Sequence, residues 1–190
     1  MSTTARQVYY TYAQYAALEE ESSIRHEYLD GEIYAMAGGS PEHAALAATI
    51  IALMRPQLPP ECRVFTSDLR VKVPATGLAT YPDATVICGR TLRASDDPLA
   101  VVNPLVLVEV TSDSTEQYDR GPKLGHYQQL PSVGSVLIVS HREPRLTLHQ
   151  RERQKDEWIT TEARAGETVA LEGLFRLAVD EVYRDGLENI

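Results

Sequence analysis

The segment from 104 to 111, PLVLVEVT, constrains the fold more than any other part of the chain. Leu105 to Val108 are apolar at every position, whereas a strand with one solvent-exposed face alternates apolar and polar residues. A continuous apolar run of this kind is typical of a strand that is covered on both faces and lies in the middle of its sheet. The chain must therefore supply layers on both sides of that sheet.

The other elements follow from apolar spacing and from turn residues. Helices are expected at about 12–22, 41–58 and 122–130. Thr11 and Gln14 make a capping pair for the first helix, Ser40 caps the second, and Pro122 stands as the first residue of the third. Strands are expected on either side of an Asp-Gly turn at 29–32 and at about 63–73, 82–88, 135–140, 145–151 and 157–162. These elements predict an α/β (α+β) fold with a mixed central β-sheet flanked by helices.

Chain length and charge bound the class of protein. The 190 residues, 43% apolar and 24% charged, are expected to form a single domain over 1–190. The formal net charge of −9 argues against a protein that coats itself in nucleic acid, because phosphate binding depends on lysines and arginines. It leaves room for a local nucleic-acid site.

Cysteine usage and apolar runs indicate the compartment. Cys62 and Cys88 lie far apart and outside any CxxC spacing, so the sequence indicates neither a zinc site nor a disulfide framework. The N-terminal stretch lacks the apolar core of a secretory signal, and the longest apolar run, 44–54, is too short to span a bilayer. We therefore expect a cytoplasmic protein with no membrane partner.

Two carboxylates stand where apolar strands would otherwise continue. Glu109 lies near the end of the central strand, and burying it unpaired would cost several kcal/mol or raise its pKa strongly. Asp83 lies at the start of the strand expected at 82–88. If the two strands are neighbours, the carboxylates converge on one point, and Mg²⁺ is held by hard oxygen ligands of this kind.

Lys123 is the third candidate. With Pro122 as the first helical residue, Lys123 falls in the first turn, where the helix dipole disfavours a cation by about 0.3–1 kcal/mol. The chain has only three lysines beside fifteen arginines, so a lysine at this position is unusual for this sequence. An ammonium can orient a water or stabilise an oxygen of a phosphorane.

Each candidate taken singly has a simpler interpretation. Asp83 suits a turn at the start of a strand, Glu109 suits a buried ion pair with an arginine, and Lys123 suits a solvated helix. His43, in the first turn of its helix, is expected to pack against the hairpin around 29–32 rather than to act as a base. Together, however, Asp83, Glu109 and Lys123 follow one another within one framework of sequence motifs, and this order favours a shared functional site over three unrelated residues.

That framework resembles a known family. YPDATV, LVEVTS and STEQYDRGPKLGHY are similar to motifs of the PD-(D/E)XK nuclease superfamily, and more closely to the bacterial Uma-type family of restriction-endonuclease-like proteins. The resemblance extends over nearly the whole chain, including RHEYLDGEIYAM, SPEHAAL and TSDLRVKV. It implies a restriction-endonuclease-like fold.

The resemblance assigns residues one by one. Asp83 matches the acid of the Pro-Asp motif, and Glu109 matches the acid of the third motif. The superfamily lysine expected two residues later is Thr111, and Lys123 on the next helix matches the displaced lysine of this family. Glu27 matches a further acidic member of the site.

The resemblance also implies an activity. It predicts a Mg²⁺-dependent endonuclease, with Mn²⁺ as a substitute, that hydrolyses phosphodiester bonds of nucleic acid, DNA in most of the superfamily. Asp83, Glu109 and the carbonyl of Val110 would bind the ion, and Tyr127 would support the site. A homodimer is expected, because cutting two strands usually needs two sites and twofold assemblies are the commonest. The alternative is a catalytically weak or inactive nuclease-fold domain that acts as a dimeric binding or regulatory module, favoured by the acidic surface and by Thr111.

Overall fold

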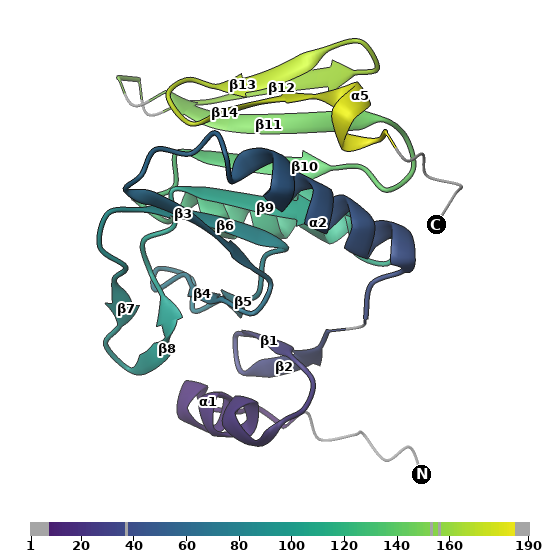
Figure 1. The fold of residues 1–190 in the computed structure, drawn as a ribbon. Coiled ribbons are helices and arrows are strands. Elements are labelled where there is room, and N and C mark those ends of the chain that lie inside the picture. Colours follow the sequence, from purple (N-terminus) through teal and green to yellow (C-terminus); the bar gives the residue numbers. More distant parts are fainter. Residues whose placement is uncertain (1–7, 37, 153, 156, 185–190) are drawn as a thin grey trace.

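The computed structural model describes residues 8–36, 38–152, 154–155 and 157–184 (Figure 1). Its helices are α1 (Tyr12–Glu21), α2 (Pro41–Met54), α3 (Glu116–Tyr118), the π-helical η1 (Asp119–Lys123), α4 (Leu124–Gln128) and α5 (Val179–Val182). Its strands are β1 (His26–Leu29), β2 (Glu32–Ala35), β3 (Cys62–Thr66), β4 (Arg70–Lys72), β5 (Ala79–Thr80), β6 (Ala84–Cys88), β7 (Arg93–Ala94), β8 (Asp97–Val101), β9 (Val106–Val110), β10 (Ser135–Val139), β11 (Arg145–Glu152), β12 (Glu157–Arg164), β13 (Thr168–Leu171) and β14 (Phe175–Ala178).

The central sheet has six strands in the order β12-β11-β10-β9-β6-β3. β9 and β10 run parallel, and the other neighbouring pairs run antiparallel. β9 lies between β10 and β6, and all five of its residues are buried. The prediction of a mixed central sheet, with the strand expected at 104–111 in its interior, is therefore confirmed, and the strand itself runs over 106–110.

Two apolar layers cover the faces of β9. On one face Val108 packs in the same cluster as Ile50 of α2, which crosses β3, β6 and β9 (Figure 1). On the other face Leu107 packs with Tyr127 of α4. Successive side chains of a strand point to opposite faces, so Glu109 shares the α4 face with Leu107. Each fully buried aliphatic side chain contributes about 1.5–3 kcal/mol, and this packing holds the strand ends in place.

The strand expected at 63–73 is interrupted. Ser67 and Asp68 form a turn between β3 and β4, because their side chains favour turns over strand ladders. β3 stays at the edge of the central sheet, while β4 joins a second sheet of order β2-β1-β5-β4-β8-β7. The predicted hairpin around 29–32 is confirmed as β1 and β2 of this second sheet, and the predicted first helix is confirmed as α1 with its Thr11–Gln14 capping box.

The second helix ends earlier than expected. It stops at Met54 rather than near 58. Arg55 still has helical dihedral angles, but Pro56 has no backbone N–H with which to continue the helical hydrogen bonds. No helix in the described part of the chain is long and apolar enough to cross a membrane.

The interpretation of the cysteines as unpaired is wrong. Cys62 and Cys88 form a disulfide between β3 and β6. They are 26 residues apart in the sequence but directly opposite each other in the antiparallel register. Sequence spacing cannot show this pairing, because it depends on which strands become neighbours.

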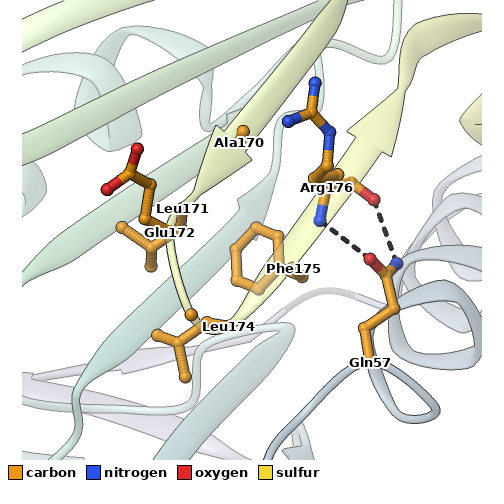
Figure 2. A pocket seen from close by; sticks show the side chains of 8 residues that line it. Gln57, Ala170, Leu171, Glu172, Leu174, Phe175 and Arg176 are labelled. Carbon is orange, nitrogen blue, oxygen red and sulfur yellow. Dashed lines mark hydrogen bonds between the residues drawn. The ribbon is translucent and has the colours of Figure 1, made fainter.

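A hollow beside the β13–β14 turn is lined mainly by apolar residues, including Leu171, Leu174 and Phe175 (Figure 2). Gln57 bonds both backbone groups of Arg176 there: it accepts from the amide N–H at 2.9 Å and donates to the carbonyl at 3.0 Å. The side chain thereby covers part of the open edge of β14. The hollow lies between the segment that follows α2 and the β13–β14 hairpin. None of the predicted site residues lines it.

Candidate active site

Asp83 and Glu109 lie side by side, as predicted. β6 and β9 are antiparallel neighbours in which Ala84 is opposite Val108, so the next position brings Asp83 beside Glu109. The backbone N–H of Val110 donates a 2.8 Å hydrogen bond to Oδ2 of Asp83, which ties the residue before β6 to the end of β9. The Val110 carbonyl as a metal ligand stays a prediction.

The side chain of Lys123 reaches Glu109, and the residue is only 5% exposed. Its Nζ lies 2.9 Å from Oε1 of Glu27, 3.1 Å from Oε1 of Glu109 and 3.6 Å from Oδ1 of Asp119. Burial alone lowers the pKa of Lys123, but the carboxylates of Glu109, Glu27 and Asp119 raise it well above its ordinary value. The ammonium is therefore charged and held by acids from three separate elements.

The helix that carries Lys123 differs from the prediction. Pro122 is not its first residue: α3, η1 and α4 follow one another over 116–128, and Pro122 lies inside η1. Because proline has no backbone N–H, the regular helical bond cannot form there, and the backbone takes a wider π turn. Lys123 ends that turn instead of opening a helix, so the predicted penalty from a helix N-terminus does not apply.

Glu109 is 4% exposed and has two polar contacts through Oε1. One is the Lys123 ammonium, and the other is the hydroxyl of Tyr127, which donates to the same oxygen. Burial raises the pKa of Glu109 to about 8, although the Lys123 charge acts in the opposite direction. The contact expected between Tyr127 and the site is thus present, while no arginine among the described residues pairs with Glu109.

Glu27 and Asp119 complete the acidic set. Glu27 of β1 accepts a hydrogen bond from the Thr80 hydroxyl and contacts Lys123, so the expected grouping of Glu27 with the other candidates is found. Asp119 was not predicted, and it is 3% exposed. Burial raises the pKa of its carboxyl against the lowering effect of Lys123. The signal that could have found it is its spacing of four residues from Lys123 on a helix.

His43 lies at the site, a position that the sequence did not indicate. Its Nε2 is 3.3 Å from Oδ2 of Asp83. The Asp83 carboxylate raises the pKa of His43, and burial partly offsets that effect. α2 packs on the opposite face of the sheet from α4, and its first turn reaches the strand ends from that side. Sequence patterns could not show this, because they do not give the angle at which the helix crosses.

The donor set suits a hard divalent cation. Three carboxylates, those of Glu27, Glu109 and Asp119, contact the Lys123 ammonium, and Asp83 lies beside Glu109. Within the described ranges, no three His, Cys, Asp or Glu side chains surround one point at which a metal ion would fit. Mg²⁺ is commonly held by one or two carboxylates, with water and substrate phosphates completing its coordination. The adjacent carboxylates of Asp83 and Glu109 fit that mode of coordination.

Thr111 occupies the position of the superfamily lysine and is fully buried. Its hydroxyl lies 2.8 Å from Nδ1 of His141, whose Nε2 lies 3.0 Å from Oδ1 of Asp113. Lys123, arriving from the helical segment, supplies the ammonium beside Glu109 instead.

Comparison with known proteins identifies the family and the relatives of the chain. A family model, Uma2, described as "Putative restriction endonuclease", matches residues 12–180. "Uncharacterized protein slr1290" of Synechocystis sp. is 34% identical over 173 residues, 90% of each chain. "Uncharacterized protein sll1609" of the same organism is 28% identical over 166 residues, 87% of this chain and 93% of the relative.

A solved structure shares the fold. The crystal structure of "a putative nuclease belonging to DUF820" from Anabaena variabilis superposes with a TM-score of 0.71. The match covers 86% of this chain and 92% of that chain, at 16% identity. The expected nuclease-like mixed α+β fold is confirmed by this likeness.

Proposed function

The chain belongs to the Uma2 family, and from that premise we propose that it is a metal-dependent endonuclease that hydrolyses phosphodiester bonds of DNA. The observation that carries the proposal is the position of the Lys123 ammonium, 3.1 Å from Glu109. Asp83 lies beside Glu109 on the neighbouring strand. An acid pair with a buried lysine can serve the hydrolysis of a phosphodiester, because it offers oxygen ligands for a cation and a fixed positive charge.

Asp83 and Glu109 would hold Mg²⁺, or Mn²⁺ in its place, with the Val110 carbonyl as a further ligand. When bound, the ion lowers the pKa of a coordinated water and withdraws charge from the scissile phosphate. Lys123 orients the attacking water or stabilises the developing charge on a phosphate oxygen. By the family resemblance, the products carry 5′-phosphate and 3′-hydroxyl ends.

Glu27 and Tyr127 set the geometry around this pair. Glu27, on strand β1 of the second sheet, lies 2.9 Å from the Lys123 ammonium. Because Glu109 of the central sheet contacts the same ammonium, the lysine is held by both sheets. Tyr127 donates to Glu109 and directs one of its oxygens. Such supporting bonds reduce the reorganisation that catalysis would otherwise require.

The test is cleavage of supercoiled plasmid and of single-stranded DNA by purified protein in Mg²⁺, Mn²⁺ or EDTA. Cutting is expected with either metal, none in EDTA, and none for Asp83→Ala or Lys123→Ala. The matched controls are Asp68→Ala and Lys155→Ala, whose side chains are 85% and 63% exposed, and both should cut like the wild type. Metal-dependent cutting that survives Asp83→Ala would contradict the site as drawn.

The second candidate is a nuclease-fold domain without useful catalysis that serves as a dimeric binding module. Thr111, buried in place of the superfamily lysine, favours it. DNA binding without cutting in any metal would support this function over the first. Light scattering after size-exclusion chromatography tests the proposed homodimer separately, because a monomer that cuts DNA would contradict only the assembly.

A further inference from the structure

We infer that His43 is a positioning residue that holds Asp83 in the orientation needed to bind a divalent cation. The inference rests on the proposed function, since it takes Asp83 as a metal ligand. His43 belongs to α2, outside the acid–lysine set, and none of the roles described above uses it.

The two oxygens of Asp83 have different surroundings. Oδ2 receives the backbone N–H of Val110 at 2.8 Å and lies 3.3 Å from Nε2 of His43. Among the described residues, Oδ1 has no hydrogen-bond or ion-pair partner. One oxygen is therefore anchored from two sides, and the other is left for a ligand. Carboxylates that bind metals are commonly fixed by hydrogen bonds to their second oxygen in this way.

The imidazole itself is held in place by its own helix. Ser40 caps α2 and accepts the backbone N–H of His43 at 3.3 Å, which fixes the first turn. Leu46 and Ile50 of the same helix pack in the core beneath the sheet. A helix fixed by core packing sets the direction of its first-turn side chains, so the ring contacts Asp83 without a flexible loop between them.

Gly39 leaves the space that the ring occupies. A Cβ atom at Gly39 would lie 2.6 Å from Nδ1, 3.0 Å from Cγ and 3.3 Å from Cβ of His43, distances too short for undisturbed contact. The neighbouring Gly38 has nothing within 4 Å of the same built position. A methyl group at position 39 should thus displace the ring while leaving the imidazole in the protein, and a methyl group at 38 should displace nothing.

The experiment measures Mn²⁺ binding by isothermal titration calorimetry, without DNA. H43A and G39A are expected to bind Mn²⁺ about 10- to 100-fold more weakly than the wild type, the usual effect of losing a partner of a ligand. H43Q, whose side-chain amide can donate to the same oxygen, should bind more tightly than H43A. G38A should bind like the wild type.

Thermal unfolding of each variant in EDTA shows whether the fold is intact. If H43A does not fold, the G39A and H43Q measurements still decide the question. A Kd for G39A within twofold of the wild type overturns the inference, and so does H43Q binding no better than H43A. Wild-type protein that binds no Mn²⁺ overturns both this inference and the metal dependence proposed above, whereas normal binding by every variant overturns this inference alone.

Discussion

The Nζ atom of Lys123 lies 3.1 Å from Oε1 of Glu109, and both residues are at least 95% buried. Two further acids, Glu27 and Asp119, share the same ammonium. A single buried cation thus supports several carboxylates, which makes this cluster sensitive to the loss of one side chain.

Lys123→Met should destabilise the protein strongly. Methionine keeps much of the side-chain volume but leaves the buried acids without a counter-charge, and breaking a buried pair in this way costs about 3–5 kcal/mol. Urea unfolding in EDTA measures the change. Lys155→Met removes a lysine whose side chain is 63% exposed, and it should cost at most about 1 kcal/mol. Equal losses in the two variants would contradict a buried charged cluster.

Divalent metal should stabilise the folded protein. A ligand that binds only the native state at about 100 times its Kd adds about 2.7 kcal/mol to the free energy of unfolding. We expect Mg²⁺ to raise the melting temperature and EDTA to reverse the rise. The double variant Asp83→Asn, Glu109→Gln should show no rise, whereas Asp68→Asn should respond like the wild type. A rise that persists in the double variant would place the ion elsewhere.

Acid pH should destabilise the protein through His149. Burial, reinforced by the positive charge of Arg120, lowers the pKa of His149 below its ordinary value. Near and below pH 6.5, the ordinary value, the unfolded chain therefore binds more protons at this site than the folded one, so stability falls as pH falls. The loss levels off once the pH is below the lowered pKa of the folded state.

The variant His149→Asn removes this titration and keeps a polar group beside Thr160, which lies 2.9 Å from Nδ1 of His149. Urea unfolding at pH 7.5 and pH 5.5 should show a smaller loss of stability for His149→Asn than for the wild type. His126→Asn, a change at a half-buried histidine of another element, serves as control and should lose as much as the wild type. An unchanged loss in His149→Asn would exclude this histidine as the cause.

The disulfide should stabilise the central sheet. Cys62 and Cys88 enclose a loop with a sequence separation of 26, and a cross-link of that span contributes about 3–4 kcal/mol by restricting the unfolded chain. Reduction with dithiothreitol should lower the urea midpoint of the wild type by the corresponding amount. The double variant Cys62→Ser, Cys88→Ser should be insensitive to the reductant. Two free thiols, found by mass spectrometry of the unreduced protein, would contradict the bond.

Much of the candidate site could be predicted from the sequence, because local features carried it. A carboxylate inside an otherwise apolar strand must have a partner, and this singled out Glu109. Pro-Asp at the mouth of the next strand upstream singled out Asp83, and the antiparallel pairing of β6 with β9 brings the two together as expected. The resemblance in order and context added Lys123 and Glu27, both of which the structure places in the cluster.

Other features depended on contacts between distant segments. The prediction for Pro122 was wrong because a helix start signal was judged without the preceding turn, which continues the helical backbone through α3 and η1. His43 and the two cysteines were misjudged for a related reason: their partners come from elements that local spacing does not identify.

The sequence by itself determined the alternation of apolar and polar residues, and with it the central strand, the flanking helices and the presence of acids where burial is expensive. Those properties depend on neighbours within a few residues, so they can be read along the chain. Only the tertiary structure decided which charges meet: that Lys123 serves Glu27, Glu109 and Asp119 together, and that His43 reaches Asp83 from the other face of the sheet. Such meetings depend on strand order and on the angles at which helices pack, and these are fixed by the core as a whole.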